Sequence, residues 1–104
     1  MIRERAHIVT KDRAGWSRTH DVVEECNRLS EERDWPASRV WKFVTGRMDE
    51  LVLETDYVDL TQFQQVQQQR HDDGGWQILI KPLIDALVDE RSYTELMTTS
   101  ESDD

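Results

Sequence analysis

The sequence predicts a single domain of the α+β class with the element order β-α-β-β-α-β. Two observations carry this prediction. Four short segments have the pattern of strands, and the first of them alternates apolar and polar residues with the two-residue period of a half-buried strand. Between them, apolar residues recur at the three- and four-residue spacing of amphipathic helices. The chain has 104 residues, the length of one domain, and its four Trp, two Tyr and two Phe supply core material although 34% of the residues are charged.

The first strand is expected at residues 3–10. Its two faces carry Ala6 with Ile8 and, opposite them, Arg5 with His7 and Val9. Residues 11–15 are expected to form a turn. A helix should follow from Trp16 to about Arg33, because apolar side chains recur at 22, 26 and 29, and Asp12 or Ser17 is the expected cap.

A β-hairpin is expected next, with strands at 39–45 and 50–57 and a reversal at 46–49. A helix capped by Asp59 or Thr61 follows, residues 72–75 interrupt it, and a second helical stretch covers 76–88. Pro82 predicts a kink or break in that stretch near residues 77–78. The last strand is expected at 92–98. The domain thus spans residues 1–97, and residues 98–104 are expected to form an acidic flexible tail.

This order of elements is the ferredoxin-like arrangement, in which an antiparallel four-stranded sheet carries its helices on one face. The other face is bare in a monomer. Yet the hairpin strands are apolar on both faces, and Trp41 and Phe43 lie together on one of them. Leaving these rings in water would forfeit several kcal/mol, at about 25 cal/mol per Å² of apolar surface. The pattern therefore predicts a homodimer in which two sheets pack against each other.

Composition excludes several classes of protein. A net charge of −9 with scattered basic residues argues against binding to nucleic acid or to an anionic membrane surface. The chain has no apolar run long enough to span a bilayer and no signal-peptide pattern, so a cytoplasmic protein is expected. One cysteine and three widely spaced histidines predict no metal site, and no phosphate loop or other cofactor motif is present. No cofactor is therefore expected.

The segment 49–60, DELVLETDYVDL, resembles NIPSNAP-like domains, as do the segments 72–76 and 38–41. These domains belong to the dimeric α+β barrel superfamily, which also holds the antibiotic-biosynthesis monooxygenases. The resemblance spans roughly residues 3–97. It implies a dimeric barrel with a pocket for a small apolar or polycyclic molecule, and activities such as cofactor-free oxygenation or isomerisation. The first strand lacks the asparagine that the haem-degrading branch carries, which argues against haem degradation.

Six residues are candidates for a site. His7 and Glu54 are candidate general bases, and Arg5 beside His7 is a candidate ligand for a substrate carboxylate. Trp41, Tyr57 and Trp76 are candidates for an aromatic clamp over a planar ligand. Each has a structural alternative. His7 could form a hydrogen bond across the dimer, Glu54 a cross-strand ion pair with Arg5, Arg39 or Lys42, and Trp76 could be plain core.

Two functional hypotheses remain open. The first is a homodimeric domain that binds a small aromatic or polycyclic molecule, with cofactor-free monooxygenase or isomerase activity. In it, His7 or Glu54 would remove a proton from an activated aromatic substrate. The second is a non-catalytic interaction protein whose sheet serves only to form the dimer. A subunit that binds a regulatory ligand is a third, weaker hypothesis.

Overall fold

A computed structural model of the chain describes residues 1–44 and 49–98. Its elements are β1 (Ile2–Val9), α1 (Arg13–Glu32), β2 (Arg39–Lys42), β3 (Glu50–Tyr57), α2 (Leu60–Asp72), α3 (Gly74–Ala86), a 3₁₀ turn η1 (Asp89–Arg91) and β4 (Tyr93–Thr98). The sheet has the order β2-β3-β1-β4, and all neighbouring strands are antiparallel. This confirms the α+β, ferredoxin-like fold class predicted from the sequence.

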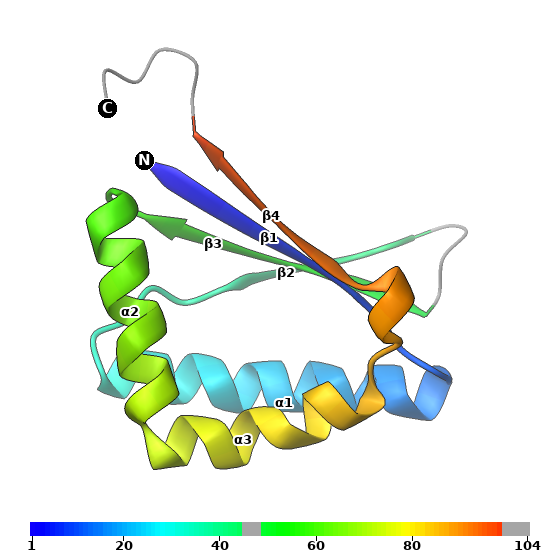
Figure 1. Ribbon diagram of the computed structural model, residues 1–104. Coiled ribbons are helices and arrows are strands. Elements are labelled where there is room, and N and C mark those ends of the chain that lie inside the picture. Colours follow the sequence, from blue (N-terminus) through cyan, green and yellow to red (C-terminus); the bar gives the residue numbers. More distant parts are fainter. Residues whose placement is uncertain (45–48, 99–104) are drawn as a thin grey trace.

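The molecule has two layers (Figure 1). Helices α1 and α3 lie side by side under one face of the sheet, and α2 crosses one end of that layer. We call the side of the sheet that faces the helices the inner face, and the other side the open face. Because Ala6 pairs with Leu53 and Ile8 with Leu51, these four side chains lie together on the inner face. The side chains of the residues between them, such as Arg5 and His7 on β1, point to the open face.

Two apolar clusters join the inner face to the helices. One is built on Ile8, Val23 and Leu83, with Ala6 and Leu53 packed against it. The other is built on Trp35, Tyr57 and Val66, with Phe63 and Trp76 against it. The first lies between β1, α1 and α3, and the second holds the end of α2 to β3. The alternation of the first strand therefore places Ala6 and Ile8 inward and Arg5 and His7 outward, as expected.

The helix α1 begins earlier than the sequence analysis expected. It starts at Arg13, so residues 13–15 are its first turn and not part of a connecting turn. The side chain of Asp12 accepts a hydrogen bond from the backbone N–H of Gly15 at 2.6 Å. This satisfies one of the free donors at the helix start, and of the two expected caps it selects Asp12 over Ser17.

The hairpin and the chain end also differ from expectation. Strand β2 ends at Lys42, which pairs with Leu51, and Phe43 and Val44 lie beyond the ladder. The expected reversal at 46–49 and the tail after residue 98 fall almost wholly outside the described residues. Strand β4 begins at Tyr93, within one residue of the expected start.

Pro82 does not break α3, which runs without interruption from Gly74 to Ala86. The expected break near residues 77–78 is therefore wrong. Pro82 removes the backbone bond to the carbonyl of Ile78, but the Ile78 side chain is 76% exposed. Because residue 78 is exposed, water can replace the missing donor there. The separate interruption expected at residues 72–75 is confirmed: α2 ends at Asp72, and the side chain of Asp73 caps α3 by accepting from the backbone N–H of Trp76.

None of the helices described within residues 1–44 and 49–98 is long and apolar enough to cross a membrane.

Candidate functional site

The six residues that the sequence singled out lie on two different sides of the sheet. Four of them are on the open face: Arg5, His7, Trp41 and Glu54. The other two are on the side of the helices: Tyr57 and Trp76. The side chains of the two groups thus point to opposite sides of the sheet, although His7 and Trp76 are both among the residues that line the cavity described below.

Glu54 is held by arginines on the open face. It is 4% exposed, accepts a hydrogen bond from Arg5 Nε at 2.8 Å, and pairs with the guanidinium of Arg39. Arg3 Nε lies 3.7 Å away and also binds Asp56 at 2.8 Å. The hydrogen bonds from Arg39 and Arg5 hold the pKa of Glu54 below its ordinary value. Glu54 therefore stays ionised near neutral pH, which suits the cross-strand ion pair better than a general base.

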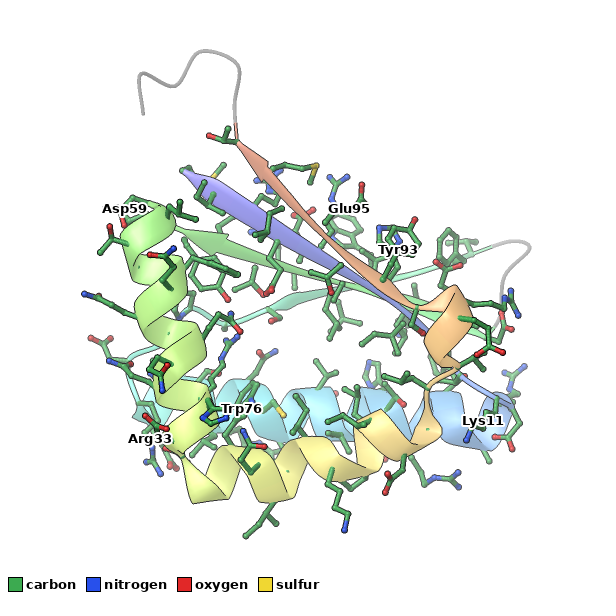
Figure 2. The ribbon with its side chains drawn as sticks, viewed as in Figure 1. Lys11, Arg33, Asp59, Trp76, Tyr93 and Glu95 are labelled. Atoms are coloured by element: carbon green, nitrogen blue, oxygen red, sulfur yellow. The ribbon has the colours of Figure 1, made fainter. Side chains whose placement is uncertain are left out.

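His7 sits between two carboxylates near the β4 edge of the sheet. Its Nε2 lies 2.6 Å from Glu95, and its Nδ1 lies 3.5 Å from Glu50. The imidazole stacks on Tyr93, with ring centroids 4.2 Å apart and an interplanar angle of 11°. Figure 2 shows Tyr93 and Glu95 along β4. These contacts fix the ring on the open face, away from the helices.

The aromatic clamp does not form. Trp41 pairs in register with Val52 and lies on the open face, where 55% of it is exposed. Tyr57 and Trp76 belong to the apolar cluster on the opposite side of the sheet. Trp76 makes an edge-to-face contact with Trp35 at 5.8 Å and lies where α2 meets α3 (Figure 2).

A cavity of about 580 Å³ lies between the inner face and the helices. Its walls come from β1, β3, β4 and all three helices. The apolar part is lined by Ala6, Ile8, Val23, Leu53, Ile80, Leu83 and Leu87. Polar side chains gather toward α2 and the start of α3: Glu4, Gln67, Arg70, His71 and Gln77. A hollow with apolar walls and a few polar groups at one end is the usual form of a small-molecule site.

The hydroxyl of Tyr57 joins the polar groups of this end into a network. It donates to Glu4 Oε1 at 3.3 Å and accepts from Arg70 Nη1 at 3.2 Å. Gln67 Nε2 lies 3.4 Å from the same oxygen. Burial is the main cause that raises the pKa of Tyr57 to about 12, so the phenol keeps its proton at neutral pH. Tyr57 acts here as a fixed donor that orients the Glu4 carboxylate.

Arg70 is the unusual member of this network. It is 8% exposed, and its Nε–H is buried without a hydrogen-bond partner. The guanidinium lies over the ring of Trp76, 4.5 Å from the centroid, and 5.8 Å from that of Trp35. Arg70 and Val66 are one helical turn apart on the buried side of α2, which carries the charge inward.

Sequence reasoning did not select Glu4 or Arg70 as site residues, although signals for both exist. Glu4 has the same strand parity as Ala6 and Ile8, which places a carboxylate on an apolar face. Arg70 continues the helical spacing of Phe63 and Val66, which places a cation on the buried stripe of α2. A charge at a core position marks a functional candidate, because burying it without a partner is costly.

The other polar groups of the cavity satisfy each other. Asn27 and the backbone of Ser38 exchange two hydrogen bonds of 2.9 Å, and Ser38 Oγ lies 2.6 Å from Thr55 Oγ1. Cys26 is buried, and burial raises the pKa of its thiol, which keeps it protonated. Among the described residues, no cluster of histidine, cysteine and acidic side chains has the geometry to hold a metal ion.

No family model matches the sequence, and no curated protein matches it either. Solved structures do share the fold. A protein from Agrobacterium tumefaciens is 13% identical, with a TM-score of 0.77 over 97% of this chain and 95% of that one. A NIPSNAP family protein from the same organism is 15% identical, with a TM-score of 0.74 over 98% and 96%. A candidate antibiotic biosynthesis monooxygenase from Nitrosomonas europaea is 8% identical, with a TM-score of 0.73 over 96% and 99%. The resemblance expected from the sequence is thus confirmed for the fold.

Proposed function

We propose that this chain binds a small apolar or aromatic molecule in the cavity between the inner face and the helices. The cavity carries the proposal. Its volume of about 580 Å³ is within the range of small-molecule sites, and its apolar walls end in a fixed group of polar side chains. A ligand in it would replace water against Ala6, Leu53 and Leu83 and meet Glu4 and Arg70 at the polar end.

We extend this proposal to catalysis without a cofactor. The chain would act as a monooxygenase, the activity that a structural relative's name suggests, or as an isomerase. In both reactions a base removes a proton from a carbon next to an aromatic system, and the resulting anion meets oxygen or rearranges. Glu4 is the carboxylate that lines the cavity, and its hydrogen bond from Tyr57 holds it in place. Strand parity directs the side chains of His7 and Glu54, the bases chosen from the sequence, to the open face; His7 is nevertheless among the residues that line the cavity, whereas Glu54 is not.

Anthrone, a tricyclic ketone with an acidic C–H group, provides the test. We expect the protein to bind anthrone, monitored by tryptophan fluorescence, and to speed oxygen uptake from its solution. Glu4→Gln should reduce the rate by at least about a hundredfold, because general bases contribute on this scale. Glu31→Gln, an exposed acid on α1, is the matched control and should change nothing. Binding without turnover would leave a binding protein and refute the catalytic part.

We also propose that two chains pair through their open faces to form a homodimer. The support is apolar surface on that side of the sheet: Trp41 is 55% exposed, Tyr93 56% and Phe43 41%. Covering half of one tryptophan removes roughly 100 Å² from water, about 2.5 kcal/mol per chain at 25 cal/mol per Å². The charges of this face are already paired within each chain, so a partner need not supply counter-charges.

Native mass spectrometry tests the dimer. We expect a species of about twice the chain mass of 12.3 kDa, and a monomer for Trp41→Ser. Leu96→Ser, a half-exposed position on β4, is a control for loss of apolar surface. A monomeric wild-type protein at micromolar concentration would refute the pairing.

The competing function is an interaction protein that dimerises and binds no small molecule. Its support is the same exposed apolar surface, and the two functions predict different effects of filling the cavity. Ala6→Phe places a ring in the cavity from the inner face, far from Trp41. If cavity binding is the function, this variant loses ligand binding and remains a dimer. If the dimer alone is the function, no ligand is bound by either protein.

A further inference from the structure

Arg70 differs from the other arginines of the described chain in its surroundings. Arg3, Arg5, Arg28, Arg33, Arg39 and Arg91 each lie within ion-pair distance of a carboxylate. Arg13 and Arg18 are exposed to water. Arg70 is 8% exposed and makes no ion pair with any residue in 1–44 or 49–98. Among these arginines of the described residues, Arg70 alone is buried from water without a carboxylate at ion-pair distance.

The neighbours of Arg70 leave part of its guanidinium without a hydrogen-bond partner. Trp76 covers one flat side at 4.5 Å, and Nη1 is engaged by the hydroxyl of Tyr57. The Nε–H has no partner, and no residue that the structure describes accepts from Nη2. Nε and Nη2 form one edge of the planar group, the fork that matches the two oxygens of a carboxylate. A buried cation with an empty fork is costly unless an anion reaches it.

Glu4 does not serve as that anion. The hydroxyl of Tyr57 stands between Glu4 and Arg70, accepts from the guanidinium, and gives its own proton to the carboxylate. With a pKa of about 12, the phenol holds this arrangement at neutral pH. Tyr57 therefore fixes the guanidinium in position while its fork remains free.

We propose that the ligand of the cavity is a small carboxylic acid, bound with its carboxylate on the fork of Arg70 and its apolar body along Ile80 and Leu83. The proposal rests on the proposed binding function and names the chemical class of the ligand. Arg70 lines the cavity at its polar end, and the apolar side chains that continue from it belong to α3 and β1. The Trp76 ring covers one flat side of the guanidinium, so a ligand must approach its edge. That edge favours a planar partner with two oxygens over a single point contact.

The wild-type protein can be tested with matched pairs of probes. 2-Naphthoate and octanoate are ionised at pH 7, whereas 2-naphthamide and octanamide have nearly the same shape without charge. Affinities are measured by calorimetry and by tryptophan fluorescence. We expect each acid to bind at least about tenfold more tightly than its amide, because a hydrogen-bonded charge pair contributes more than the same bond to a neutral group.

Variants locate the effect at Arg70. Arg70→Gln should weaken the acids by about tenfold or more and change the amides by less than about threefold. Arg70→Lys keeps the charge without the fork and should lie between. Arg18→Gln, an exposed arginine on α1 outside the cavity, is the matched control and should behave as wild type. Circular dichroism establishes that each variant is folded, and the wild-type comparison of acid with amide needs no variant.

The outcomes separate this inference from the function on which it rests. Equal affinity for acid and amide, with both bound, overturns the inference and leaves cavity binding in place. Equal losses for acid and amide in Arg70→Gln also overturn it, because they show a purely structural role. If none of the four probes binds but anthrone does, the inference fails and cavity binding stands; if anthrone does not bind either, the proposed function fails and the inference fails with it.

Discussion

The hydroxyl of Tyr57 makes hydrogen bonds with Glu4, Gln67 and Arg70. Tyr57→Phe therefore tests whether this hydroxyl organises the polar end of the cavity. The substitution keeps the ring, which packs edge-to-face on Phe63 with centroids 5.1 Å apart. It removes the donor to Glu4 and the acceptor for Arg70. Tyr57 is only 1% exposed, so water does not easily replace the lost partners.

The magnitude follows from the geometry. The contacts at this oxygen are 3.2 to 3.4 Å long, at the weak end of the hydrogen-bond range. Each contributes about 0.5–1 kcal/mol, and Arg70 is left with fewer partners in a buried position. We therefore expect Tyr57→Phe to lower the free energy of unfolding by about 2 kcal/mol, and the melting temperature by about 10 °C for a domain of this size.

Urea and thermal unfolding, followed by circular dichroism, give both quantities. Tyr93→Phe is the matched control, because Tyr93 is 56% exposed and its hydroxyl makes no hydrogen bond with the described residues. We expect it to change the free energy by less than about 0.5 kcal/mol. Equal stability of the two variants would refute the view that the Tyr57 hydroxyl organises Glu4 and Arg70.

Three further predictions concern pH and the helices. Because the pKa of Tyr57 rises from 10.0 to about 12 on folding, its contribution is complete below pH 10.0 and is lost as the pH rises through 12. The free energy of unfolding should therefore fall by about 3 kcal/mol across this window, and Tyr57→Phe should lack the fall. The arginine contacts lower the pKa of Glu54 from 4.5 and that of Asp56 from 3.8. The two ionised carboxylates therefore stabilise the fold fully above these unfolded-state pKa values, and this stability is lost as the pH falls through the lowered folded-state pKa values. Glu54→Gln should make the acid side of the stability profile less steep in urea titrations. Pro82→Ala should raise the free energy of unfolding by about 1–3 kcal/mol, measured the same way, because it restores a donor to the Ile78 carbonyl.

The faces of the strands were predictable because they follow from covalent geometry. Successive side chains of a strand point to opposite sides, so the parity of Ala6 and Ile8 already separates them from Arg5 and His7. The same parity places Glu54 beside Arg5 and Arg39, two of the three partners proposed for it. Lys42, the third, lies on the inner face, where its ammonium group is 5.9 Å from the centroid of the Trp16 ring.

Helix boundaries were less predictable because capping and solvent competed with residue preference. Gly15 suggested a turn, but the carboxylate of Asp12 accepts its N–H and starts the helix there. Pro82 suggested a break, but the residue whose carbonyl it leaves unbonded, Ile78, is 76% exposed. In both cases the local residue indicated a cost; the carboxylate of Asp12 offsets it at Gly15, and exposure to solvent offsets it at Pro82.

The site was half predictable. Tyr57 and Trp76 were chosen as aromatic residues; Trp76 lines the cavity, and Tyr57 lies behind its polar end, where its hydroxyl contacts Glu4 and Arg70. What joins them is Arg70, and its contact with Tyr57 depends on how α2 lies across the end of β3. That packing is a long-range feature that no spacing in the sequence encodes. Trp41 was grouped with them by residue type alone, and the sheet separates it from both.

An acidic chain is at first sight a poor host for an acidic ligand, since the net charge is −9. The distribution of charge removes this objection. On the open face, Arg3, Arg5 and Arg39 are paired with Glu54 and Asp56, so that face presents little unbalanced charge to a partner. Most remaining acids are exposed, where salt screens them beyond about 8–10 Å. The polar end of the cavity holds one cation, Arg70, and one carboxylate, Glu4, and both are bonded to the hydroxyl of Tyr57. An anion that binds the unpartnered edge of Arg70 meets the cation directly, and the low dielectric strengthens that attraction. We infer that the excess of carboxylates on the surface does not decide what the cavity binds.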